Sequence, residues 1–267
     1  MKQGRIMKSR VGNMLGVIFA AFLTITALCF IIMTFSEPVA PRIPDEYHGK
    51  TDARGGSPAL NDAISSFRKK IIINPITIQG DPYERSDRDA SAAAIQHDEV
   101  CGIRYLDPAK TNYVIKTFPN RATAHSERYI ISHYGPCGTC STLQDLAVYL
   151  QYPDLTAVSV RCSFLFTQGL VTRCLEQYGF TRPCALTWYY NIRHTRRRCF
   201  AVCLRSRLTR EPSNRPDGSL NPCLQCDEEE SGPVFKKTAG RTRRNSGIVS
   251  SIRRDDREIR HITHDYY

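Results

Sequence analysis

The sequence lacks the common catalytic signatures. It has no Gly-x-Ser-x-Gly elbow, no His-Glu-x-x-His zinc motif, no phosphate-binding loop and no Gly-rich dinucleotide fingerprint. One short match, Asp87-Arg88-Asp89, has the Asp-x-Asp form used by metal-dependent glycosyltransferases. It lies in a polar segment, and the rest of the chain is small for that fold. None of these enzyme classes is therefore favoured.

No internal repeat is visible, and no Asn-x-Ser/Thr glycosylation site follows residue 35. The missing glycosylation site removes one support for residence in the secretory pathway without contradicting it. With 267 residues, the chain has room for one or two domains. A domain of this size buries a real core without help from disulfides.

One long apolar run stands near the N-terminus. Met14–Phe35 is 22 residues long and carries no charge, and a helix needs about 20 residues to cross the hydrocarbon core of a bilayer. The run is longer than the apolar region of a cleaved signal peptide. Four basic residues precede it and favour a cytoplasmic N-terminus. The sequence thus predicts a single-pass type II membrane protein with a signal-anchor helix and a lumenal or extracellular C-terminal domain.

The predicted chain has four parts: a cytoplasmic tail at 1–13, the anchor at 14–35, a stalk or spacer with a short helix at 36–99, and a globular domain at 100–267. Three β-like runs open the globular domain, at Cys101–Leu106, Asn112–Phe118 and Arg128–Tyr134. Four helical patterns follow, the last from Pro183 to about Cys203. The predicted fold class is α+β: one N-terminal transmembrane helix plus one cysteine-rich, mainly helical domain.

Eleven cysteines are more than a domain of this size needs for folding. Cys29 lies in the apolar run, and the other ten suit five disulfides, a metal site or a mixture. Disulfides are the default in a lumenal or extracellular setting. Cys199 and Cys203 are four residues apart on the last predicted helix, where their β-carbons would be about 5–6 Å apart. A disulfide needs about 3.8 Å, so each is expected to bond another segment or to share a metal.

The sharpest local feature is the segment from His133 to Cys140, HYGPCGTC, which leads directly into a helical pattern. The start of a helix stabilises a thiolate and lowers its pKa. The spacing and placement of Cys137 and Cys140 are similar to the redox motif of thioredoxin-like proteins. This resemblance, which covers four residues and a helix start, implies a catalytic pair with Cys137 as nucleophile. A local disulfide, bonds to distant cysteines and metal binding are the alternatives.

Histidines near this motif suggest a metal site. His125 and His133 flank one β-like run and, at a separation of eight, can share one face. With Cys137 and Cys140 they form a possible ligand set for copper, zinc or iron. A surface or capping role is the alternative for each histidine. A second Cys-x-x-Cys pair begins at Cys223. The two pairs are separated by many more residues than the two pairs of a zinc ribbon, so the spacing is a weak indication of a zinc site.

Basic residues gather in two blocks of the globular domain. Residues 193–210 hold seven arginines and no acid, and residues 236–260 hold nine basic and three acidic residues. In the second block, Arg241, Arg243 and Arg244 stand among small polar residues, and arginine is suited to bidentate contacts with carboxylate, phosphate or sulfate. These three are the predicted cofactor- or anion-binding residues. The alternative is a solvated basic surface that pairs with the acidic run 227–230.

Two functions remain open at this point. The first is a membrane-anchored ectodomain, cross-linked by disulfides, that binds an anionic ligand or partner such as a carboxylate, phosphate, sulfate or lipid headgroup. The second is a membrane-anchored oxidoreductase that uses a Cys/His metal site or a redox-active cysteine pair. The membrane is a predicted partner and nucleic acid is not, because the basic blocks lack interleaved aromatics. The sequence identifies no cofactor.

Overall fold

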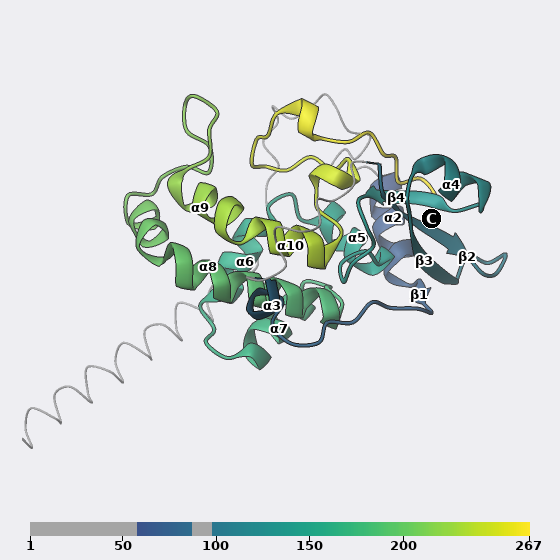
Figure 1. The fold of residues 1–267 in the computed structure, drawn as a ribbon, viewed down its shortest axis with the longest axis horizontal. Coiled ribbons are helices and arrows are strands. Elements are labelled where there is room, and N and C mark those ends of the chain that lie inside the picture. The colour runs from purple at the N-terminus through teal and green to yellow at the C-terminus, as the bar shows by residue number, and fades with distance from the viewer. Residues whose placement is uncertain (1–57, 87–97) are drawn as a thin grey trace, which may run out of the picture. The chain divides into compact units, whose positions relative to one another are not determined.

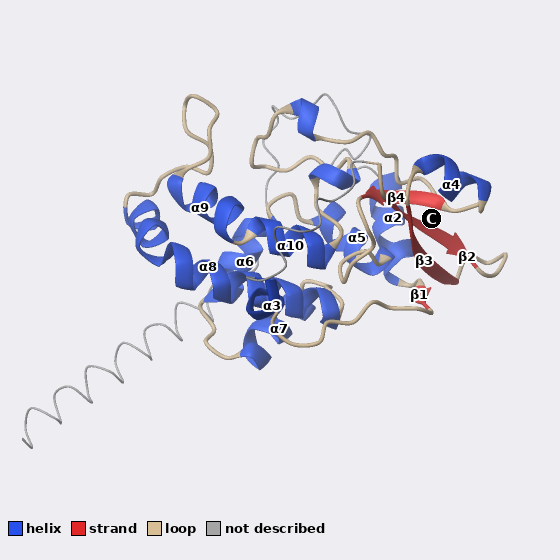
Figure 2. Cartoon of the chain, viewed as in Figure 1, coloured by secondary structure: helices blue, strands red, loops and turns tan. Residues whose placement is uncertain are grey.

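The computed structural model of the chain describes residues 58–86 and 98–267. All of these residues belong to one compact unit that spans residues 43–267. A small sheet packs against helices at one end of this unit, and the remaining helices lie beyond it (Figures 1 and 2).

The predicted membrane anchor is corrected by the structure. Within residues 58–86 and 98–267, no helix is both long and apolar enough to cross a membrane. The longest, α8 (Arg182–Leu208), has 27 residues but carries seven arginines. Met14–Phe35 itself lies outside the described residues. The finding weighs against the predicted fold class, which included a transmembrane helix, and against the single-pass localisation, both of which rested on apolar length and flanking charge alone. The structure supports a mixed helix-and-sheet fold with disulfides.

The sheet has four strands in the order β1-β3-β2-β4. Strand β2 pairs antiparallel with β3 and β4, and β1 pairs parallel with β3. The strands are β1 (Ile71–Ile72), β2 (Val100–Tyr105), β3 (Asn112–Phe118) and β4 (Ile130–Tyr134). The first four residues of β2 are all buried, as expected for a central strand covered on both faces. The three β-like runs predicted from sequence are therefore confirmed as β2, β3 and β4, with bounds that differ by at most two residues.

Helices make up about half of the described chain. They are α2 (Pro58–Arg68), α3 (Pro82–Ser86), α4 (Arg121–Ser126), α5 (Leu143–Gln151), α6 (Leu155–Ser163), α7 (Gln168–Gln177), α8, α9 (Pro222–Glu230) and α10 (Gly232–Ala239), with short 3-10 turns η1 (Arg244–Ser246) and η2 (Asp256–Glu258). Several begin at a side chain that accepts a backbone N–H three residues later, as Thr142 does for α5 and Asp154 for α6. The sequence pattern predicts Asp154 as the cap of α6, as observed, and Ser141 as the cap of α5, one residue before the observed cap Thr142.

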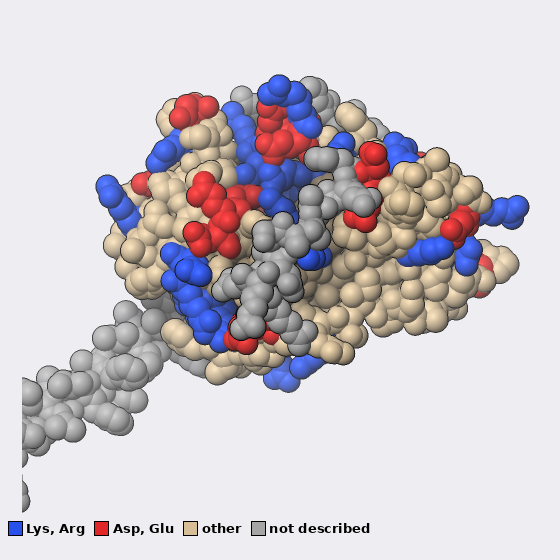
Figure 3. Space-filling model, in the orientation of Figure 1, with Lys and Arg blue, Asp and Glu red and all other residues tan. Residues whose placement is uncertain are grey.

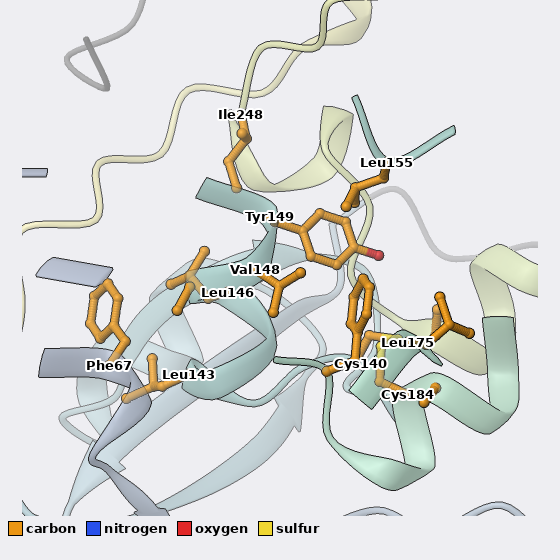
Figure 4. Packing of buried hydrophobic residues seen from close by; sticks show 14 of the residues in the cluster. Phe67, Cys140, Leu143, Leu146, Val148, Tyr149, Leu155, Leu175, Cys184 and Ile248 are labelled. Atoms are coloured by element: carbon orange, nitrogen blue, oxygen red, sulfur yellow. A yellow bond between two sulfur atoms is a disulfide. The ribbon is translucent and has the colours of Figure 1, made fainter. Parts of the chain in front are cut away.

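Helix α5 forms the centre of the core. Its residues Leu143, Leu146 and Val148 are completely buried, and Figure 4 shows them among side chains from α2, α7 and the C-terminal segment. Burial of each such side chain contributes about 1.5–3 kcal/mol. Phe67 of α2 is also completely buried in this core. The short helix predicted in the 36–99 spacer is thus α2, and it packs within the same unit as the sheet.

The chain after Glu211 contains two short helices, α9 and α10. The sequence pattern there predicts ordered loops or short elements, and these two helices agree with it. Asn221 caps α9 by accepting the N–H of Leu224, and Pro222 stands in its first turn. Figure 1 shows α9 and α10 beside the long helix α8. This arrangement brings the second basic block of the sequence over α8.

Candidate anion-binding cavity

All ten cysteines in the described residues form disulfides, which confirms the predicted disulfide-rich character. The pairs are Cys101–Cys137, Cys140–Cys184, Cys162–Cys174, Cys199–Cys226 and Cys203–Cys223. The last two join α8 to α9. The expectation that Cys199 and Cys203 would each bond another segment is confirmed.

The two cysteines of the Cys-x-x-Cys motif do not bond each other. Cys137 bonds Cys101 on β2, and the buried Cys140 bonds Cys184 at the start of α8 (Figure 4). The motif therefore links the sheet to the helices. A redox role would require one of these bonds to open, and it remains a prediction.

Backbone packing around the motif is very close. A β-carbon added to Gly138 would lie 2.5 Å from backbone atoms of Ala239 and Gly240. Gly240 has a φ of 72° and would meet Gly138 in return. Two glycines are needed here because only they allow the chains to approach so closely. The contact places the segment after α10 directly on the cysteine motif.

The structure separates the predicted metal ligands. His125 is exposed on α4, whereas His133 is completely buried on β4. The Nδ1–H of His133 donates to the Tyr134 carbonyl at 2.9 Å, so its Nε2 accepts from the Ser141 hydroxyl at 2.7 Å. Burial lowers the pKa of His133 well below its usual value and keeps the ring neutral. No group of three or more His, Cys, Asp or Glu in the part described could hold a metal, so a metal site has no support there.

Arg241 is a buried structural cation rather than part of a cavity wall. Its guanidinium donates to the carbonyls of Cys140 at 3.1 Å and Ser132 at 3.2 Å, and to the hydroxyls of Ser132 at 2.6 Å and Ser246 at 3.1 Å. The side chain is 0% exposed. It does not line the cavity that its neighbours Arg243 and Arg244 share. The predicted three-arginine cluster is thus divided.

Arg243 and Arg244 line the same cavity, which has a volume of about 160 Å³. Its walls come from α5, α6, α8, α9, α10 and the C-terminal segment. Four basic side chains line it: Lys236, Arg243, Arg244 and Arg254. Two acidic side chains line it as well, Asp227 and Glu228. On the face shown in Figure 3, basic and acidic side chains lie next to each other over α9 and above α10.

Glu228 neutralises three of the four cations. Its carboxylate lies 2.9 Å from Arg244, 3.1 Å from Lys236 and 2.7 Å from Arg254. Burial raises the pKa of Glu228, but the three cations outweigh burial and hold that pKa below its ordinary value. Arg244 also pairs with Glu258 at 2.6 Å. These contacts match the predicted alternative, in which the basic block pairs with the acidic run.

Arg243 is the exception. Its guanidinium donates to the backbone carbonyls of Val249, at 2.8 Å, and Tyr152. Among the described residues no carboxylate forms an ion pair with it, and its Nε has no hydrogen-bond partner. Burial lowers the pKa of Arg243 to about 10. The ring of Tyr149, 5.9 Å away, and the charge of Asp154 favour the cation, but neither offsets the effect of burial. A cation with an enclosed, unpaired Nε is costly, and an anionic partner would relieve that cost.

Comparisons with known proteins give one match. A family model described as "Family of unknown function (DUF8771)" matches residues 168–262. This region runs from the start of α7 past η2 and contains all four basic residues of the cavity. No curated protein and no solved structure matches the chain.

Sequence patterns missed several residues of the cavity. Lys236 and Arg254 lie in the basic block that was singled out, but their spacing gives no sign that they meet Arg243. Trp188 lies on α8, more than 40 residues before the block. Asp227 was expected only as a surface partner of the basic residues. These residues meet because α8, α9 and α10 pack together, which no local pattern indicates.

Proposed function

We propose that this protein is a disulfide-cross-linked binding domain whose cavity holds the anionic group of a ligand, a carboxylate, phosphate or sulfate. The observation that carries this proposal is Arg243, a partly buried guanidinium in the cavity wall that forms no ion pair with a carboxylate in the part of the chain described. An anion bound there would form charge-assisted hydrogen bonds, which are stronger than those to carbonyls. Basic side chains also outnumber acidic ones in the wall.

The disulfides support a binding role because they hold the cavity walls in place. Cys199–Cys226 and Cys203–Cys223 fix α9 against α8. Both helices contribute to the cavity, through Asp227 on α9 and Trp188 on α8. A site that is ordered before the ligand arrives costs less entropy to fill.

Binding can be measured through the only tryptophan of the chain, Trp188, which lines the cavity. Acetate, inorganic phosphate and sulfate are titrated while its fluorescence is recorded. Arg243→Gln removes the unpaired cation, so we expect at least a tenfold loss of affinity, which corresponds to about 1.4 kcal/mol. Arg243→Lys keeps the charge but not the planar fork, so an intermediate loss is expected.

Arg257→Gln is the matched control. Arg257 is largely exposed, pairs with Asp255 at 2.6 Å, and does not line the cavity. Circular dichroism confirms that each variant is folded before titration. The proposal is rejected if no anion changes the fluorescence of the wild type, or if Arg243→Gln and Arg257→Gln bind anions equally well.

A further inference from the structure

A second and larger cavity lies between α6, α8 and α9. It has a volume of about 550 Å³, within the range typical of small-molecule sites. Apolar side chains from all three helices line it: Val160, Phe164, Ile192, Phe200, Leu204 and Leu224. Phe200 is 60% exposed and Leu204 is 44% exposed. This surface has the size and the apolar character of a binding site for a hydrocarbon chain.

The two cavities adjoin. Five residues line both of them: Thr156, Trp188, Asn191, Leu224 and Asp227. One end of the combined space is small and rich in cations, and the other end is large and apolar. Thr156, Asn191 and Asp227 give the junction a polar character. A hydrocarbon chain is therefore favoured only in the large cavity. The cations of the small cavity favour an anion there.

We propose that the ligand is an anionic amphiphile, with its head in the small cavity at Arg243 and its alkyl chain in the large cavity. This inference rests on the proposed anion site and adds the class of ligand. The complementary character of the two ends supports it, because a charged head gains most at the partly buried cation that forms no ion pair. Asp227 stands at the junction and disfavours an anion there, so the head must lie on the far side of it.

The opposite orientation is the main rival. Arg196, Arg207 and Arg210 also line the large cavity, but all three are exposed. Arg207 lies 5.0 Å from the ring of Phe164, and Arg196 donates to the Ser163 carbonyl. Exposed cations hold an anion weakly, because water and salt screen the charge. Arg243, which is partly buried and has an enclosed Nε, is therefore the preferred site for the head.

The first test varies chain length. Acetate, octanoate, decanoate and dodecanoate are titrated below their micelle concentrations, with Trp188 fluorescence as the readout. We expect affinity to rise about three- to fourfold for each added methylene. Dodecyl phosphate distinguishes a phosphate head from a carboxylate head. Decanol, which has the same chain as decanoate and no charge, should bind at least tenfold more weakly than decanoate.

The second test uses matched variants. Leu204 lines the large cavity and Leu170 does not, yet both are about half exposed, at 44% and 49%. Leu204→Gln should weaken dodecanoate at least threefold and leave acetate unchanged, whereas Leu170→Gln should change neither. Arg243→Gln should weaken dodecanoate at least tenfold, and Arg207→Gln less than twofold.

The outcomes separate this inference from the proposed function. If acetate or phosphate binds through Arg243 but affinity does not rise with chain length, the amphiphile is wrong and the anion site stands. If decanol binds as well as decanoate, or if Arg207→Gln is the more damaging variant, the proposed orientation is overturned. If no anion of any length depends on Arg243, the anion site fails and this inference fails with it.

Discussion

At the scale of single residues, Asp145 gives the clearest pH dependence. It is completely buried and accepts hydrogen bonds from the Thr142 hydroxyl and from the N–H and hydroxyl of Thr181. Burial raises its pKa to about 6, and the hydrogen bonds only partly oppose this. The folded state thus holds this proton more tightly than the unfolded state, whose Asp pKa is about 3.9. The resulting stabilisation is complete below the unfolded value and is lost as pH rises through 6.

The test is Asp145→Asn, measured by chemical denaturation between pH 3.5 and 7.5. The free energy of unfolding of the wild type minus that of the variant should fall as pH rises from 4 to 7. Asp217→Asn is the control, because hydrogen bonds from Ser219 lower the pKa of this exposed carboxylate. The free energy of unfolding of the wild type minus that of Asp217→Asn should rise, not fall, as pH rises. A wild-type minus Asp145→Asn difference that stays constant with pH would contradict the assignment.

The arginines show how far residue identity predicts a site. The density of basic residues predicts an anion site at Arg241, Arg243 and Arg244, yet Arg241 contacts the sheet while Arg243 and Arg244 face a cavity. Their directions depend on the turn at Gly240, which has a φ of 72° and packs against Gly138. That contact joins segments about 100 residues apart. A tertiary contact of this kind leaves no trace in the local sequence.

At the scale of elements, the two disulfides between α8 and α9 are expected to be partly redundant. Cys203–Cys223 closes a loop with a separation of 20 residues, and Cys199–Cys226 closes one of 27 residues around it. A single loop of this size stabilises by about 3 kcal/mol in the chain-entropy model. Once one bond is present, the other closes only a few additional residues. Replacing either pair by alanine should therefore cost less than half as much as replacing both.

Chemical denaturation of the three variants measures this non-additivity. The control is Cys162–Cys174, which has a separation of 12 residues and lies outside the α8–α9 hairpin that the other two bonds close. The stability lost on removing Cys162–Cys174 should add to the stability lost on removing either hairpin bond. Full additivity of the two hairpin bonds would show that each stabilises the fold by a mechanism other than loop closure.

The same hairpin explains why sequence patterns missed α9. No residue of α9 is fully buried, so it has no apolar stripe of the kind that marks a surface helix. The disulfides and the cap at Asn221 hold it instead. By contrast, α5 has Leu143, Leu146 and Ala147 at helical spacing, all buried, and was predicted correctly. Periodicity finds helices that are stabilised by the core and overlooks those held by cross-links.

At the scale of the whole molecule, Arg241 joins parts that are distant in sequence. Its guanidinium contacts Ser132 on β4, Cys140 in the cysteine motif and Ser246 in the C-terminal segment. Arg241→Met keeps much of the side-chain volume and removes every donor. Each buried acceptor that is left unpaired costs about 1–3 kcal/mol. We therefore expect a loss of about 3 kcal/mol or more in the free energy of unfolding.

This loss should affect the sheet and the helices together, because Arg241 lies where they meet. Far-ultraviolet circular dichroism and Trp188 fluorescence should report one coincident transition at a lower denaturant concentration. Arg257→Met, at an exposed arginine that pairs only with Asp255, should change stability by less than about 0.5 kcal/mol. Two separate transitions in the Arg241→Met variant would contradict this expectation and would mean that, without this cation, the cysteine motif and its disulfides do not suffice to make the two parts unfold together. A loss as small as that of Arg257→Met would mean that water replaces the guanidinium as donor to the Ser132 and Cys140 carbonyls.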